Sequence, residues 1–345
     1  MRSVIPTQTT RGPTGLQTAG LVAGALALSM LYIQTRKAAA ERENPPQGKF
    51  IDVDGVRLHY TERGEGPALV LLHGNGLFAT DFDLSGLTER ASQSYRLIIF
   101  DRPGFGYSER PGATTWTPEA QAQLFYKALH QIGVERPIVV GHSWGTLVTL
   151  AMAMALDYPK YVRAITLISG YYYPSMRLDV PIMATPAIPG LGHLLRYTIS
   201  PLLGRLMWPM LVKQMFSPAP VPERLNALPK WMALRPSQLQ ASAAETALMV
   251  PSAKRLSERY GELTLPIAVI AGSGDKIVNV EHNALRFHEE VNHSDLLVEE
   301  GVGHMPHYAD PERVMEAVAR LETSMAQGSG HVQRVGAQQG PATLH

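Results

Sequence analysis

Short apolar runs alternate with longer helical patterns through most of the chain after residue 49. Six runs have the length of strands and are mainly apolar: residues 68–72, 96–100, 137–140, 164–169, 265–271 and 295–299. A central parallel strand is covered on both faces, so it is apolar along its whole length. The alternation therefore predicts an α/β fold, with a mainly parallel sheet and helices on both faces.

A separate apolar segment lies near the N-terminus. No charged residue occurs from Gly12 to Thr35, and Leu16–Ile33 alone would make about 27 Å of helix. That length just spans a hydrocarbon core of about 30 Å, so we expect residues 1–36 to be an uncleaved, single-pass membrane anchor. Ala38–Ala40 also fits a signal-peptide cleavage site and would give an exported protein, but two basic residues just before it argue against cleavage. Basic residues on both flanks leave the orientation open.

The rest of the chain divides by composition. Residues 37–48 are charged and contain two prolines, which predicts a linker to a core of residues 49–170. About 90 residues without a β pattern follow the strand at 164–169, which we take as the sixth strand of the fold. We interpret residues 171–262 as an inserted helical cap. The core resumes over 263–325, and the Gly- and Gln-rich residues 326–345 are typical of a disordered tail. The cap is rich in methionine, which suits either an apolar substrate or the cap's own core.

The most informative motif is Gly141-His142-Ser143-Trp144-Gly145, between the strand at 137–140 and an uncharged segment. Strand, G-x-S-x-G and buried helix together are typical of a nucleophile elbow. A serine on so tight a turn adopts a costly backbone conformation, and the flanking glycines let strand and helix pass without a clash. The helix N-terminus then faces the serine and favours developing negative charge.

A nucleophilic serine needs a base, and the base needs a carboxylate. Asp275 follows the strand at 265–271 and His304 follows the strand at 295–299, so both lie at the sheet edge that carries Ser143. Asp275 alone could be an ordinary turn residue, and His304 alone a surface residue. The chain order Ser, Asp, His, with each residue after a different strand, favours a triad. His307 is the rival base, and we interpret His142 as structural.

Tetrahedral intermediates need two N–H donors for their oxyanion. We expect one from the backbone of Trp144. The other should come from the glycine-containing loop after the strand at 68–72, from Asn75 or Gly76. His73, Asp101 and Arg102 follow strand ends in the same region, and we interpret them as braces for these loops.

The motifs together resemble the successive signatures of the α/β-hydrolase superfamily, in the branch with esterases, C–C hydrolases, cofactor-free haloperoxidases and epoxide hydrolases. The resemblance covers about residues 49–323 and rests on five motifs: H-G-N-G, D-R-P-G-F-G-Y-S, G-H-S-W-G, A-G-S-G-D-K-I-V and G-V-G-H-M-P-H. It implies Ser143 as nucleophile, Asp275 as acid and His304 as base. Epoxide hydrolases and haloalkane dehalogenases carry Asp at the elbow, so the serine argues against both activities.

Composition narrows the function further. A net charge of +1 gives no reason to expect nucleic acid, and the absence of cysteine excludes a disulfide framework and a thiolate metal site. We expect a serine hydrolase without cofactor or metal that cleaves a carboxylic ester of an apolar small molecule. The alternatives are C–C bond hydrolysis or perhydrolysis by the same triad, and a non-catalytic membrane-anchored binding module. The oligomeric state stays open.

Overall fold

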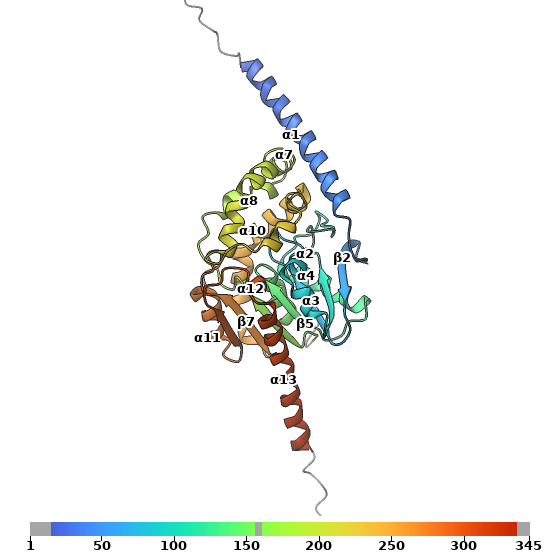
Figure 1. The fold of residues 1–345 in the computed structure, drawn as a ribbon, viewed down its shortest axis with the longest axis vertical. Helices are drawn as coiled ribbons and strands as arrows, with labels where there is room; N and C mark the ends of the chain where they lie inside the picture. Colours follow the sequence, from blue (N-terminus) through green and yellow to red (C-terminus); the bar gives the residue numbers. More distant parts are fainter. Residues whose placement is uncertain (1–14, 156–160, 337–345) are drawn as a thin grey trace, which may run out of the picture.

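One eight-stranded sheet organises the molecule (Figure 1). The structure, a computed structural model, describes residues 15–155 and 161–336. The strand order is β1-β2-β4-β3-β5-β6-β7-β8; β2 pairs antiparallel with β1 and β4, and every other neighbouring pair is parallel. The strands are β1 Lys49–Val53, β2 Val56–Arg63, β3 Ala68–Leu72, β4 Arg96–Phe100, β5 Ile138–His142, β6 Ala164–Ile168, β7 Ile267–Gly272 and β8 Asp295–Glu299.

Helices occupy most of the connections. The α-helices are α1 Gly15–Glu43, α2 Thr80–Ser85, α3 Leu87–Ala91, α4 Pro118–Gln131, α5 Gly145–Ala153, α6 Val180–Met183, α7 Leu191–Thr198, α8 Ser200–Phe216, α9 Lys230–Ala233, α10 Pro236–Ser257, α11 Arg286–Glu290, α12 Pro306–Ala309 and α13 Pro311–Gly336. Four short turns of other helix types complete the set: η1 Thr185–Ala187, η2 Glu223–Ala227, η3 Tyr260–Glu262 and η4 Glu281–Leu285.

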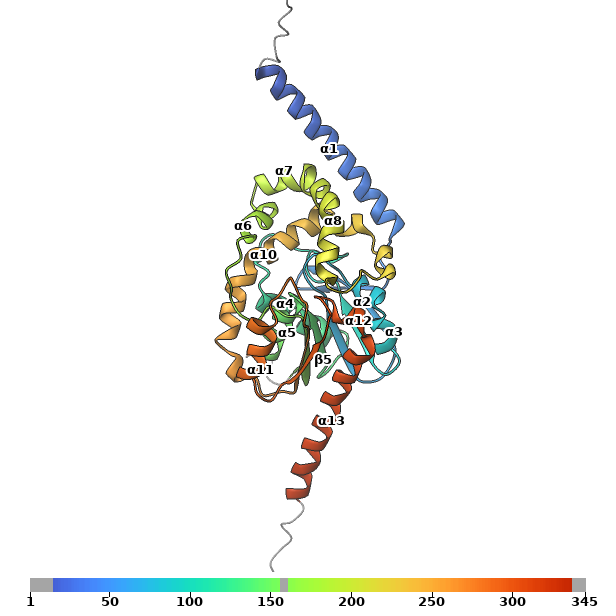
Figure 2. The ribbon, with the colours of Figure 1, turned by 60° about the vertical axis from the view of Figure 1, so that its left-hand side comes forward.

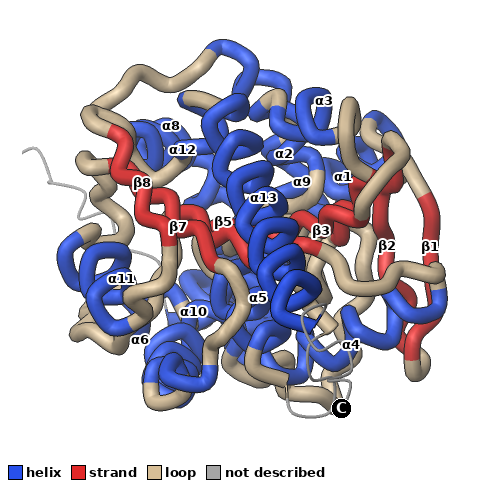
Figure 3. Tube along the Cα trace, turned by 90° about the horizontal axis from the view of Figure 1, so that it is seen from below, coloured by secondary structure: helices blue, strands red, loops and turns tan. Residues whose placement is uncertain are grey.

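The two faces of the sheet bury separate apolar clusters. Along β3, Leu69 and Leu71 point into the cluster shared with α2, α3 and α13, whereas Val70 and Leu72 point into the cluster shared with α4 and α5. Figure 3 shows the strands as a band with α3 and α13 on one side and α4, α5 and α11 on the other. Because both faces are covered, a central strand such as β3 is apolar along its whole length. The mainly parallel sheet with helices on both faces, predicted from this pattern, is confirmed.

The residues between β6 and β7 form a helical insertion that comprises α6 to α10 and η1 to η3. It lies at the end of the molecule nearest α1, as Figure 2 shows for α7 and α8. The Gln-, Ala- and Leu-rich sequence of α10 gives its longest helix, of 22 residues. The boundary of 171–262 that we assigned to a cap stays a prediction.

The N-terminal helix differs from expectation at its C-terminal end. Residues 37–43, expected in a linker, continue α1 to Glu43. Ala38–Ala40 are strong helix formers, Lys37 and Glu41 pair one turn apart at 4.0 Å, and Pro45 then stops the helix. Contacts with the folded domain also hold this end, including an ion pair of 3.0 Å between Arg235 and Glu41. Residues 37–43 are therefore helical and docked, and the linker boundaries that we assigned stay a prediction.

The C-terminal helix also runs further than expected. We predicted a disordered tail from residue 326, but α13 continues to Gly336. Glycine lowers helix propensity by about 1 kcal/mol without removing a backbone hydrogen bond, so the Gly-rich stretch does not end the helix. The remainder of the predicted tail, residues 337–345, lies outside the described residues.

Candidate active site

Ser143 lies on a strained turn between β5 and α5. Its φ of 51° falls in the left-handed region that non-glycine residues rarely adopt. The turn is held by a hydrogen bond of 2.8 Å from the Ser143 amide to the Ile168 carbonyl on the neighbouring strand β6. The side chain is partly exposed, so the hydroxyl is accessible at the carboxyl edge of the sheet.

The glycines around Ser143 are required by space. A Cβ at Gly145 would lie 2.3 Å from the Leu72 carbonyl oxygen, and one at Gly141 would lie 2.4 Å from Thr149 Oγ1. A Cβ on Gly74 would come within 3.1 Å of Ser143 Cβ. The loop after β3 therefore lies directly against the serine.

The structure brings Ser143, His304 and Asp275 into one hydrogen-bonded chain. His304 Nε2 lies 2.9 Å from Ser143 Oγ, and His304 Nδ1 lies 2.7 Å from Asp275 Oδ2. A carboxylate oxygen only accepts, so Nδ1 carries the proton and Nε2 is free to accept one from the serine. The amides of Ile277 and Val278 donate to Asp275 Oδ1 at 2.7 and 3.0 Å, which fixes the carboxylate.

The two loops that carry these groups are joined to each other and to the helical insertion. The Gly274 amide donates to the Val302 carbonyl at 2.9 Å, which links the aspartate loop to the histidine loop. The His304 amide donates to the Met215 carbonyl near the end of α8 at 2.8 Å. A Cβ at Gly303 would overlap the carbonyls of residues 215–217, so the insertion packs directly on the histidine loop.

The predicted oxyanion donors adjoin Ser143 or the residue in contact with it: Trp144 is the chain neighbour of Ser143, and Asn75 and Gly76 follow Gly74. Among the described residues, the backbone amides of Trp144, Asn75 and Gly76 have no hydrogen-bond acceptor. The Asn75 side chain donates to the Ser242 carbonyl and to Thr246 Oγ1 of α10, both at 3.1 Å. Helix α10 thus covers the loop whose amides remain available.

Sequence reasoning missed Glu245, which lies in the middle of α10. It forms an ion pair with Arg102, and both side chains are fully buried. Arg102 also donates through Nε to the His73 carbonyl at 2.8 Å and through Nη2 to the Gly74 carbonyl at 3.1 Å. The Trp144 indole donates to the Glu245 carbonyl at 3.1 Å. A charged residue within an apolar helical segment was the only available signal.

Asp101, the neighbour of Arg102, fixes the adjacent loops as we interpreted. Its carboxylate accepts from the Ala79 amide at 2.8 Å, from the Tyr107 amide at 2.9 Å and from His59 Nδ1 at 2.7 Å. His73, on the other side of Arg102, is neutral because burial lowers its pKa to about 3. It accepts the Arg102 amide proton through Nε2 at 3.0 Å.

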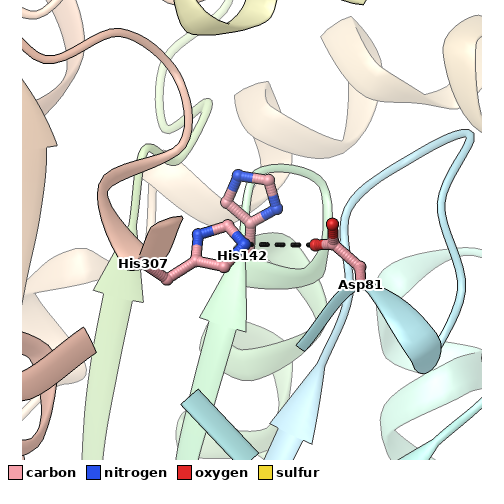
Figure 4. A group of neighbouring side chains, drawn as sticks. All are labelled: Asp81, His142 and His307. Atoms are coloured by element: carbon pink, nitrogen blue, oxygen red, sulfur yellow. Dashed lines mark hydrogen bonds and ion pairs between the residues drawn. The ribbon is translucent and has the colours of Figure 1, made fainter. Parts of the chain in front are cut away.

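A second histidine group lies behind the base. Figure 4 shows Asp81, His142 and His307, whose nearest side-chain atoms all lie within 4.8 Å of one another, a spacing that could hold a cation. Hydrogen bonds already engage both rings: His307 Nε2 donates to Asp81 within the group at 3.1 Å, and His142 Nε2 donates to the His304 carbonyl outside it at 3.0 Å. Burial holds the pKa of His142 well below its usual range, so this ring is neutral. His307, the rival base, is paired with Asp81 and not with Ser143.

Asp179, a carboxylate in the segment after β6, lies elsewhere. It forms an exposed ion pair of 2.7 Å with Arg177 just before α6. The structure therefore offers Asp275 as the carboxylate of His304.

Comparisons with known proteins agree with this fold. Residues 69–317 match the model of the alpha/beta hydrolase family. The chain is 30% identical over 159 residues to a 2-hydroxymuconate semialdehyde hydrolase of Pseudomonas putida, which covers 45% of this chain and 56% of that relative. It is 29% identical over 290 residues to an uncharacterized protein of Mycobacterium tuberculosis, covering 80% of this chain and 81% of the other.

Two solved structures share the fold at low sequence identity. An esterase from Exiguobacterium antarcticum is 20% identical with a TM-score of 0.65, covering 80% of this chain and 100% of that one. A bacterial membrane phospholipase A is 19% identical with a TM-score of 0.61, covering 89% and 94%. The chain belongs to the alpha/beta hydrolase family.

The buried pair predicts a large loss of stability in Glu245→Ala. Removing the carboxylate leaves Arg102 charged and unpaired in the core, which should cost about 3–5 kcal/mol of unfolding free energy. Urea unfolding followed by circular dichroism measures this, with Glu258→Ala as the matched control because Glu258 is an exposed glutamate at the end of the same helix. Equal unfolding midpoints for the two variants would contradict the prediction.

Proposed function

We propose that this protein is a serine hydrolase that cleaves carboxylic esters of apolar substrates through an acyl-enzyme. The observation that carries the proposal is the continuous hydrogen-bonded chain from Ser143 through His304 to Asp275. Ser143 Oγ attacks the ester carbonyl and its proton passes to His304 Nε2. His304 returns that proton to the leaving alcohol, and then activates the water that hydrolyses the acyl-enzyme.

Backbone amides support the oxyanion in this proposal. The Trp144 amide is one donor, at the start of α5, where the helix dipole adds to its effect. In a trans peptide the C=O and N–H point in opposite directions. Because Arg102 holds the Gly74 carbonyl, the Asn75 amide points away from Arg102, which favours Asn75 over Gly76 as the second donor.

A second candidate is hydrolysis of a C–C bond in a diketone-like substrate. The similarity to the 2-hydroxymuconate semialdehyde hydrolase favours it, although the match spans little more than half of that relative. Perhydrolysis would use the same residues. A series of nitrophenyl esters of increasing chain length, run beside a ring-cleavage product, separates these chemistries by their relative kcat/KM.

We also propose that α1 anchors the enzyme in a membrane. The helix is long and apolar enough to cross a bilayer, although a signal sequence would pass the same test. Only 6% of its most apolar stretch is buried, which argues against a core helix of a soluble domain. The fold shared with a membrane phospholipase A is weak additional support.

Replacing the nucleophile tests the enzyme proposal. Ser143→Ala should lower kcat by about 10⁴-fold or more while the protein stays folded, because the attacking group is lost. A fluorophosphonate probe should label the wild type and Ser237→Ala, an exposed serine of α10, but not Ser143→Ala. Absence of labelling in the wild type would support the non-catalytic binding module instead.

The ranking of two histidine variants tests the base. His304→Ala should be as damaging as Ser143→Ala, whereas His307→Ala should keep more than about a tenth of kcat, because His307 contacts Asp81 and not the serine. Steady-state kinetics on a short soluble ester measure both. The opposite ranking would assign the base to His307.

Replacing the carboxylate tests the acid. Asp275→Asn should preserve the fold and lower kcat by up to ~10⁴-fold, because an amide can stabilise the wrong tautomer of His304 and does not stabilise its charged form. Asp179→Asn is the matched control, and its kcat should match the wild type. Near-normal activity of Asp275→Asn would remove Asp275 from the mechanism.

A further inference from the structure

Helix α1 and the helical insertion are in contact within the apolar part of α1. Ser29 Oγ donates to the Thr198 carbonyl at the end of α7 at 2.6 Å. One turn further, the rings of Tyr32 and Trp231 meet edge-on at 5.9 Å, and Ile33 is buried. Figures 1 and 2 both show α1 running past α7 and continuing beyond the domain.

If α1 crosses a bilayer, this contact determines where the helical insertion lies relative to the membrane surface. The uncharged helical stretch from Gly15 to Thr35 is 21 residues, or about 31 Å, which matches a hydrocarbon core of about 30 Å. With the whole domain held in water, only residues 15–28 of this helical stretch would remain to span the core, about 21 Å. A span of full length therefore draws the Ser29–Thr198 contact, and α7 with it, below the membrane surface.

The side chains around this contact suit such a location. Of the twenty-two exposed large hydrophobic residues in the described part of the chain, nineteen lie on α1 or between residues 176 and 210. The second group, the α6–α8 apolar surface, consists of Met176, Leu178, Ile182, Met183, Ile188, Leu191, Leu194, Ile199, Leu202, Leu203, Leu206 and Met210. Single exposed apolar residues are ordinary, but a group this concentrated marks an interaction site.

Charge in the same region favours lipid over a protein partner. Between Met176 and Met210 the single carboxylate is Asp179, which is paired with Arg177 at 2.7 Å, and no Asp or Glu follows from Val180 to Pro222. Arg205 and Lys213 are exposed on α8, where long cationic side chains can reach anionic headgroups. Arg36 stacks on the Trp231 ring at 5.3 Å at the charged end of the apolar stretch, a pairing typical of a membrane–water interface.

We propose that the α6–α8 apolar surface inserts into the leaflet that α1 crosses, so that the helical insertion takes its substrate from the bilayer. This inference rests on the proposed anchor and hydrolase, and it narrows the substrate class to acyl esters that reside in the leaflet. Near its end α8 contacts the histidine loop, since the Met215 carbonyl accepts the His304 amide. A single helix thus connects the inserted surface to the base.

The cysteine-free chain allows a direct test of depth. Leu206→Cys in the full chain is labelled with an environment-sensitive fluorophore and reconstituted in phosphatidylcholine–phosphatidylglycerol vesicles. Val298→Cys, an exposed apolar position outside the α6–α8 apolar surface, is the matched control, and Leu21→Cys reports α1. We expect doxyl-labelled lipids to quench the fluorophore at positions 206 and 21 by more than about two-fold and to leave position 298 unchanged.

The three labels separate the possible failures. Quenching at 21 without quenching at 206 overturns the inserted surface and leaves the anchor intact, whereas loss of quenching at both overturns the anchor as well. A blue-shifted but unquenched label at 206 means that a second copy of the chain covers the surface, which also overturns the inference. Fluorophosphonate labelling of Ser143 in the same samples reports the hydrolase independently.

A charge variant tests the link to substrate. Leu206→Glu should lower turnover of a vesicle-resident acyl ester by about ten-fold or more and leave turnover of a short soluble ester unchanged, because a carboxylate resists burial in lipid. Leu285→Glu, at an exposed leucine of η4, is the control and should change neither rate. Equal rates for Leu206→Glu and the wild type on the vesicle ester would overturn the inference.

Discussion

A fully buried ion pair between Arg102 and Glu245 holds the two parts of this molecule in register. Burying two charges costs several kcal/mol each, and the pair is tolerated only because further hydrogen bonds satisfy the remaining donors. Those donors of Arg102 reach the carbonyls of His73 and Gly74. Glu245 of the helical insertion therefore fixes the side chain that holds the loop beside Ser143. The insertion is therefore part of the site's support and not a detachable cover.

The same constraint explains how a strained serine persists. A non-glycine residue at φ 51° costs of order 1–3 kcal/mol and persists only where its surroundings fix it. Here β6 binds the Ser143 amide, the β3 loop closes on one side through Gly74, and the Trp144 indole is tied to the Glu245 carbonyl. Sheet, loop and helix α10 each oppose relaxation of the turn, so the hydroxyl stays aimed at His304.

The sequence predicted the sheet well because its central strands are buried on both faces. The runs at 68–72 and 96–100 coincide with β3 and β4, because a strand that is covered on both faces needs mainly apolar residues. The three side chains of the proposed triad were found because each follows a strand end. Glu245 was missed because its partner lies 143 residues away and no local pattern marks it. The docked end of α1 was missed for the same reason, because Trp231 and Arg235, which contact it, lie almost 200 residues further along the chain.

The connection from lipid to chemistry runs through one helix. Helix α8 presents apolar side chains at its start and middle, and close to its end the Met215 carbonyl binds the His304 amide. A shift of α8 within a leaflet would move the histidine loop, because the glycine at 303 leaves no space between that loop and residues 215–217. The Asp275 loop would move with it, since Gly274 bonds to Val302. Because all of these contacts lie within the folded domain, the base stays aligned with the nucleophile when α8 is free of lipid, and the bilayer governs access of the substrate and not the chemistry of the site.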